Sequence, residues 1–309
     1  NIELIATTES PLDPLDHHRA IRASGWHGRV ITAYRPDPVM DPEAPGFADN
    51  LLRFAAISGE DVGTFEGYLR AHRARRAAFR EAGATSTDHG HPSAFTADLT
   101  RGEIEALYAR VLAGPATPAE SELFRGHMLT EMARMSVEDG MVMQLHPGVH
   151  RSHNPAVTAR FGRDKGSDIP LAGEFVRGLK PLLDAFGNDP RLTLILFTLD
   201  EDTYSRELAP LAGHYPALRI GPPWWFHDSP EGMRRFREAV TETGGFYNGV
   251  GFNDDTRAFL SIPARHDVAR RMDCGFLARL VAEHRLEEDE AHEVAHALSY
   301  GLVKQAYKL

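Results

Sequence analysis

The chain has 309 residues, of which 42% are hydrophobic and 25% are charged, a composition typical of globular proteins. Its net charge of −10 argues against nucleic acid as the main partner. No apolar run is long enough for a transmembrane helix, and no signal peptide is recognisable, so we expect no membrane partner. A single cysteine, Cys274, rules out disulfides within the chain. We expect this thiol to be buried, and the protein to be cytoplasmic.

Short apolar segments alternate with longer amphipathic segments along the chain. The apolar segments predict strands at residues 2–8, 29–34, 84–87, 141–145, 192–199, 217–220 and 246–252. Helical spacing predicts helices that include residues 101–112, 119–138, 171–186, 266–283 and 288–307. Such repeated strand–helix units are typical of α/β proteins with a parallel sheet.

Two parallel architectures fit this pattern, an open doubly wound sheet and a closed barrel. No glycine-rich nucleotide-binding motif follows any strand, which removes the main argument for the open sheet and for a nucleotide cofactor. A (β/α)8 barrel needs eight strands, and seven are predicted. We therefore expect a single barrel domain over residues 1–309, with its first strand in a region that precedes residue 1.

Polar residues follow the predicted strands at the points where they end. They are Glu9, Arg35, Asp88 with His89, His146, Asp200, Trp224 with Trp225, and Asp255 with Arg257. In a parallel barrel these ends surround one mouth, where active sites are built. The structural alternative is that the aspartates cap helices and the arginines form surface ion pairs.

The residues expected at the strand ends are mainly histidine, aspartate and arginine. This set suits a divalent metal held by nitrogen and oxygen ligands, an anion bound by arginine, and proton transfer next to a carbonyl group. No GxSxG motif is present, which argues against a serine hydrolase. We assign no role to the helical histidines, among them His292 and His296.

Six motifs in order along the chain resemble the uronate isomerase (glucuronate isomerase) family of the amidohydrolase superfamily. They are Thr7-Thr8-Glu9-Ser10-Pro11, Arg35-Pro36-Asp37, Thr87-Asp88-His89-Gly90, Gln144-Leu145-His146-Pro147-Gly148 with Arg151, Trp224-Trp225-Phe226-His227-Asp228, and Asp255-Thr256-Arg257-Ala258-Phe259-Leu260-Ser261 with Arg265-His266-Asp267. The family pairs these motifs with an HxH metal motif on its first strand. Here the nearest pattern, His89-Gly90-His91, belongs to the third of these motifs, so we expect the metal motif to lie upstream.

The resemblance implies a distorted (β/α)8 barrel that interconverts D-glucuronate with D-fructuronate, or D-galacturonate with D-tagaturonate. It implies Asp255 as ligand of a divalent metal, with zinc as first choice, and as a catalytic group with Arg257 and His146. The residues implied to bind the sugar acid are Arg35, Asp88, His146, Arg151, Trp224, Trp225 and Arg257. A homo-oligomer is also expected.

Two alternatives remain open at this stage. One is a metal-dependent hydrolase or decarboxylase of the same superfamily that acts on another acid. The other is a sugar-acid binding protein without catalysis. Departures from the family pattern, such as Glu9-Ser10 and Asn253-Asp254, leave room for a different substrate.

Overall fold

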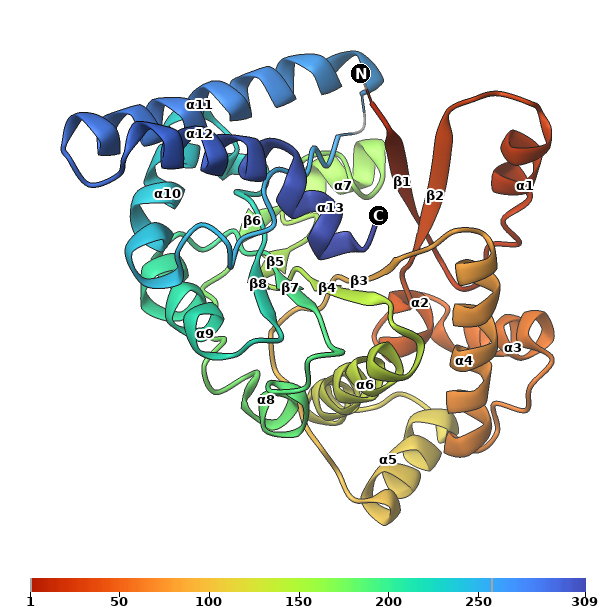
Figure 1. Cartoon of the computed structure of the whole chain (residues 1–309). Coiled ribbons are helices and arrows are strands. Elements are labelled where there is room, and N and C mark those ends of the chain that lie inside the picture. The colour runs from red at the N-terminus through yellow and green to blue at the C-terminus, as the bar shows by residue number, and fades with distance from the viewer. Residues whose placement is uncertain (1, 257) are drawn as a thin grey trace. The chain divides into compact units, whose positions relative to one another are not determined.

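The computed structural model describes residues 2–256 and 258–309, which form two compact units (Figure 1). Unit 1 comprises Asn1–His91, Phe95–Gln144 and Leu179–Leu192, and unit 2 comprises Pro92–Ala94, Leu145–Gly178 and Thr193–Leu309. Both units contain parallel strands connected through helices. The predicted α/β class is confirmed, while the closed barrel and the single domain stay predictions.

The sheet of unit 1 begins with three parallel strands. β1 (Leu4–Glu9) pairs with β2 (Arg29–Tyr34) along its whole length, and β2 pairs with β3 (Ser86–His89) through Tyr34 and Thr87. β4 (Val142–Leu145) is the next strand in the sheet order. Because the first three strands run in the same direction, Glu9, Arg35 and Asp88 come to the same edge. The backbone N–H of Arg35 donates to the carbonyl oxygen of Glu9 at 3.0 Å.

Helices connect and cover these strands. They are α1 (Asp16–Ala23), α2 (Asp37–Met40), α3 (Phe47–Ser58), α4 (Phe65–Glu81), α5 (Arg101–Ala113), α6 (Pro118–Asp139) and α8 (Lys180–Phe186). α6 begins with a capping box in which Thr117 and Glu120 satisfy each other's backbone N–H groups. It ends at Gly140, which has a φ of 80°. The predicted helix 119–138 is confirmed to within one residue at each end.

The core of unit 1 is rich in aromatic side chains. Tyr68 on α4 stacks on Tyr108 of α5 with ring centroids 5.0 Å apart. The guanidinium group of Arg76, which is 1% exposed, lies beside this core. It forms two hydrogen bonds with the carboxylate of Asp139, at 2.7 and 2.9 Å, and one with Ser136 Oγ at 3.1 Å. The pair therefore joins α4 to α6 in a fixed geometry.

Unit 2 is built on the parallel strands β7 (Leu194–Leu196) and β8 (Leu218–Ile220). The short strands β5 (Val149–His150) and β6 (Ile169–Pro170) form an antiparallel pair that the sequence did not predict. The main helices are α7 (Pro155–Phe161), α9 (Ala209–His214), α10 (Pro230–Gly244), α11 (Ile262–Ala282), α12 (Glu288–His296) and α13 (Leu302–Tyr307). Leu277, Val294, Leu298 and Leu302 form a buried cluster between the C-terminal helices.

Three expectations from the sequence are wrong. Residues 246–252 form no strand, and their sheet contact is an isolated bridge from Gly249 to Ile220. Gly251 has a φ of 76°, and a Cβ there would lie 2.5 Å from the carbonyl oxygen of Leu298, so the backbone turns where an extended strand was predicted. In the predicted helix 171–186, the helix begins only at Lys180. Cys274 is exposed on α11.

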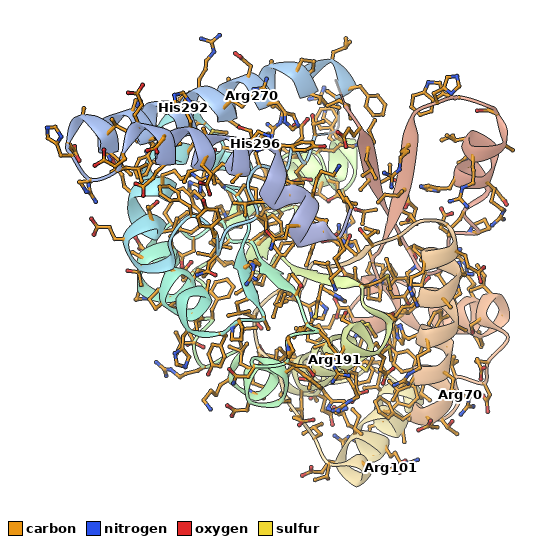
Figure 2. The ribbon with its side chains drawn as sticks, in the orientation of Figure 1. Arg70, Arg101, Arg191, Arg270, His292 and His296 are labelled. Carbon is orange, nitrogen blue, oxygen red and sulfur yellow. The ribbon has the colours of Figure 1, made fainter. Side chains whose placement is uncertain are left out.

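The surface carries many charged side chains, several of which are labelled in Figure 2. Arg70, Arg101 and Arg191 each pair with a nearby carboxylate. His292 and His296 are exposed on α12. None of the helices among residues 2–256 and 258–309 is long and apolar enough to span a lipid bilayer.

The buried Arg76–Asp139 pair generates a stability prediction. We expect Arg76→Met to lower the free energy of unfolding by about 3 kcal/mol, because Asp139 and Ser136 lose their charged partner within a packed interface. Urea unfolding followed by circular dichroism measures this. Arg101→Met, at an exposed pair on α5, is the control and should leave the unfolding curve unchanged. Equal effects of the two substitutions would contradict the argument.

His127 on α6 generates a prediction for the pH dependence of stability. Its ring is 2% exposed, its Nδ1 accepts the backbone N–H of Leu99 at 3.1 Å, and burial lowers the pKa of His127 to about 4. The unfolded value is about 6.5, so the stability that the neutral ring contributes is complete above that pH and is lost as the pH falls towards 4.

We therefore expect the stability of the wild type to fall more steeply than that of His127→Gln between pH 6.5 and 4. The gap between the two curves should change by about 3 kcal/mol at most over this range. Denaturant unfolding at a series of pH values measures it. Parallel curves would show that His127 does not titrate as its burial requires.

Candidate functional site

In unit 1, charged residues converge where β1, β2 and β3 end. Glu9 accepts a hydrogen bond from the hydroxyl of Thr32 and lies 3.7 Å from His18 Nε2. Arg35 directs its Nε to Asp37 Oδ2 at 2.9 Å and its Nη1 towards Asp88 Oδ2 at 3.4 Å. Both of these carboxylates are largely buried. The predicted residues Arg35 and Asp88 are therefore brought together.

Asp37 is the centre of this group. Its Oδ2 also accepts the backbone N–H of Gly90 at 3.0 Å, which ties the start of α2 to the turn after β3. Burial alone would raise the pKa of the Asp37 carboxyl, but Arg35 and the nearby imidazoles outweigh it, and the pKa lies below its usual range. Asp37 is therefore an anion at neutral pH.

Two histidines lie next to Asp37. His89 is fully buried and His91 is 6% exposed. The Nε2 of His89 is hydrogen-bonded to Thr87 Oγ1 at 3.0 Å. Burial, followed by the field of His91, lowers the pKa of His89 to about 3, so its ring is neutral. Asp37, His89 and His91 each present one ligand atom, and these atoms all lie within 4.8 Å of one another.

In unit 2, the predicted residues His146, Trp224 and Asp255 form a second cluster. The indole Nε1–H of Trp224 donates to Asp255 Oδ2 at 2.7 Å. The imidazole of His146 packs edge-on against the same indole, with ring centroids 5.0 Å apart. His146 and Trp224 are buried, whereas Asp255 is exposed. The indole of Trp224 thus contacts both the carboxylate of Asp255 and the imidazole of His146.

The backbone around this cluster is unusual. Trp225 and Asp255 have φ values of 42° and 47°, a left-handed conformation that costs free energy for residues other than glycine. Arg265 helps to hold the loop that carries Asp255. It donates to Asp228 Oδ2 at 2.7 Å and to the carboxylate and the carbonyl oxygen of Asp254. Asp254 is therefore a structural partner of Arg265.

Arg151 joins the cluster through Trp225. Its guanidinium carbon lies 5.2 Å from the centroid of the Trp225 ring. Its Nη1 donates to the buried carboxylate of Asp168 at 3.2 Å, and Asp168 also accepts the backbone N–H of Ser152. Sequence reasoning missed Asp168, because it lies 17 residues after Arg151 in a segment without a motif.

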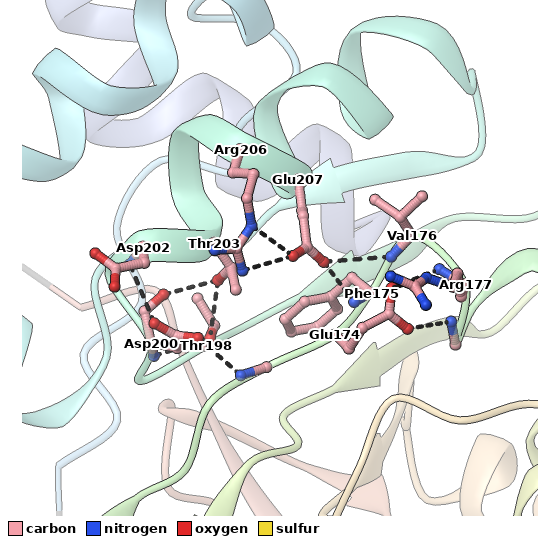
Figure 3. Close-up of polar contacts among 12 residues, drawn as sticks. Glu174, Phe175, Val176, Arg177, Thr198, Asp200, Asp202, Thr203, Arg206 and Glu207 are labelled. Atoms are coloured by element: carbon pink, nitrogen blue, oxygen red, sulfur yellow. Dashed lines mark hydrogen bonds and ion pairs between the residues drawn. The ribbon is translucent and has the colours of Figure 1, made fainter.

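Asp200, another residue expected at a strand end, has a structural role (Figure 3). Its carboxylate accepts the backbone N–H groups of Gly173, at 2.7 Å, and Asp202, at 3.1 Å. Glu207 accepts those of Phe175 and Val176. Because these backbone N–H groups donate to carboxylates, residues 173–176 are held in a non-helical conformation, and the predicted helix begins late.

Arg257 lies outside the described residues, so its predicted role stays a prediction. The remaining predicted site residues fall into two groups, one in each unit. Arg35 and Asp88 belong to unit 1, and His146, Arg151, Trp224, Trp225 and Asp255 belong to unit 2. Sequence reasoning also missed the association of Asp37 with His89 and His91. The signal was present in the HxH spacing of residues 89–91, but Asp37 lies 52 residues before His89.

The predicted metal ligand Asp255 can be tested against its surroundings. Among the described residues, the group of His, Cys, Asp and Glu side chains suited to a metal ion is Asp37, His89 and His91, and Asp255 is not part of it. Asp255 contributes one carboxylate that is already bonded to an indole N–H. Alone it does not fit a metal centre, which needs at least three protein ligands. The chain nevertheless contains a ligand group suited to a divalent cation.

Similar proteins and similar solved structures are uronate or glucuronate isomerases. A uronate isomerase from Rhizorhabdus wittichii is 72% identical over the whole chain, which covers 66% of that protein. A glucuronate isomerase structure from Caulobacter crescentus matches with a TM-score of 0.98 and 65% identity, over all of this chain and 64% of that one. A uronate isomerase structure from Thermotoga maritima matches with a TM-score of 0.93 and 26% identity, over 99% of this chain and 68% of that one.

The chain thus spans just under two thirds of the length of the first two relatives. The sequence model of the glucuronate isomerase family matches residues 1–307, which is nearly the whole chain. The resemblance drawn from the six motifs is therefore confirmed, and the chain belongs to the glucuronate isomerase family.

Proposed function

We propose that the protein is a uronate isomerase that interconverts an aldose and a ketose form of a sugar acid through an enediol intermediate. The substrates are D-glucuronate, which gives D-fructuronate, or D-galacturonate, which gives D-tagaturonate. The observation that carries the proposal is the fixed position of Asp255 and His146 on the indole of Trp224. Family membership over residues 1–307 supports it.

The reaction moves protons both at the carbon atoms and between the oxygen atoms of C1 and C2. A base removes the proton from C2, and a proton is then delivered to C1, while the hydroxyl and carbonyl oxygens exchange roles. Asp255 is exposed and held by one hydrogen bond, so its second carboxylate oxygen can accept the carbon-bound proton. We assign to His146 the proton transfer at the substrate oxygens, because imidazole both donates and accepts protons near neutral pH.

The substrate carboxylate requires a cationic partner. Arg151 is half-buried, stacks on Trp225 and is oriented by Asp168, so it is prepared to bind an anion without reorganisation. Arg35, Asp88 and Arg257 stay predictions as further substrate contacts. The zinc ion at Asp255, the homo-oligomer and the single barrel domain also stay predictions.

The first test measures activity with the protein expressed from its complete gene. We expect ketouronate, followed by NMR in deuterated water, from D-glucuronate or D-galacturonate, with deuterium incorporated at C1. Asp255→Asn should lower kcat by about 10²–10⁴-fold, because the proton acceptor at carbon is lost. Asp202→Asn, at an exposed carboxylate after β7, is the matched control and should retain activity.

Other outcomes would favour the alternatives. Turnover of a uronate without ketouronate would indicate a hydrolase or decarboxylase. Binding of the uronate by a folded protein without any turnover would indicate a sugar-acid binding protein. Either result contradicts the isomerase proposal.

The indole–carboxylate contact gives a second prediction. Trp224→Phe keeps an aromatic ring against His146 but removes the Nε1–H donor to Asp255. We expect kcat to fall about 10-fold with a smaller change in KM, because one hydrogen bond to a charged group is lost while the substrate contacts remain. Trp26→Phe, at an indole that is 59% exposed, is the control. An unchanged kcat in Trp224→Phe would show that the indole does not position Asp255.

A further inference from the structure

Three potential metal ligands of unit 1 face one another at the ends of β2 and β3. Asp37 opens α2, His89 ends β3, and His91 follows two residues later. The Nε2 of His91 lies 4.0 Å from Asp37 Oδ1, and the ligand atoms of all three side chains lie within 4.8 Å of one another. Backbone regions 52 residues apart in the sequence are thus arranged around a common point.

Two of these atoms have an unusual environment. Asp37 Oδ1 and His89 Nδ1 are inaccessible to solvent and have no hydrogen-bond partner among the described residues. A buried polar atom without a partner costs roughly 1–3 kcal/mol. Native structures retain such atoms rarely, so each calls for a partner other than the described side chains, such as a water molecule or a cation.

The other polar atoms of the same two side chains are fully used. Asp37 Oδ2 accepts from Arg35 Nε and from the backbone N–H of Gly90, and His89 Nε2 is bonded to Thr87 Oγ1. Histidines and carboxylates that bind metals are oriented in this way, with the second polar atom held by an outer partner. The arrangement presents Asp37 Oδ1 and His89 Nδ1 in fixed directions.

We propose that Asp37, His89 and His91 bind a divalent cation of the zinc type, at a site distinct from any metal at Asp255. Two imidazole nitrogens and one carboxylate oxygen are the ligands that such cations favour, and a water molecule completes a four-coordinate site. Binding shortens the distances between the three ligand atoms, which now lie within 4.8 Å of one another, because ligands of a tetrahedral zinc ion lie roughly 3.4 Å apart.

The position of this site gives the cation a structural role. Asp37 also holds Arg35, whose Nη1 lies 3.4 Å from Asp88. A cation on Asp37 Oδ1 and the two histidines therefore fixes the turn after β2 to the turn after β3. It fixes Arg35 and Asp88 with them, whatever substrate the protein takes.

The test is metal content, measured with the protein expressed from its complete gene. After equilibration with zinc and removal of the excess, mass spectrometry of the wild type should find one more equivalent of metal than in His91→Gln. Asp255→Asn should retain this equivalent, which separates the proposal from the metal and the activity predicted at Asp255. His127→Gln, which removes another buried histidine of unit 1, is the matched control and should also retain it.

Thermal unfolding provides a second readout. Zinc should raise the Tm of the wild type by an increment that is lost in His91→Gln and kept in His127→Gln. Should His91→Gln fail to fold, crystals of the wild type grown with zinc decide the question through anomalous scattering. A peak about 2.1 Å from Asp37 Oδ1 and His89 Nδ1 is expected. An ordered water at that point, without anomalous signal, would overturn the proposal.

Discussion

The parallel pairing of β1, β2 and β3 is the constraint on which the chemistry of unit 1 depends. Each strand enters the sheet in the same direction, so the residue that follows one strand lies beside the residue that follows the next. Arg35 thereby reaches both Asp37 and Asp88, and Gly90 donates to Asp37. Without this common direction, the same charged residues would be dispersed among surface loops and paired with water.

Unit 2 positions its polar residues by different means. The segment before Asp255 does not extend as a strand, and Asp255 itself has a left-handed backbone. Local structure does not favour this conformation, so other contacts must stabilise it. The indole of Trp224 binds the Asp255 carboxylate, and Arg265 binds the adjacent Asp254. Strain of this kind is common where a side chain must be presented to a substrate, and it is offset by contacts elsewhere.

The distinction between functional and structural carboxylates follows from their partners. Asp200 and Glu207 accept backbone N–H groups of residues 173–176, and Asp139 accepts hydrogen bonds from a buried guanidinium group. Their hydrogen-bonding capacity is used within the fold. Asp37 keeps one buried carboxylate oxygen without a hydrogen-bond partner among the described residues, and Asp255 is exposed to solvent beside its hydrogen bond from Trp224. On this basis we propose ligand binding at Asp37 and proton transfer at Asp255.

The sequence by itself determined the α/β class and the extent of α6, because hydrophobic periodicity is a local property, and the order of its motifs indicated His146, Trp224 and Asp255 as candidate residues. Only the tertiary structure decided that Asp37 joins His89 and His91, that Asp168 orients Arg151, and that residues 246–252 turn. The physical reason is that these outcomes depend on contacts between residues far apart in the chain. Asp37 and His89 are 52 residues apart, and no periodic pattern in the sequence indicates that their side chains lie close together.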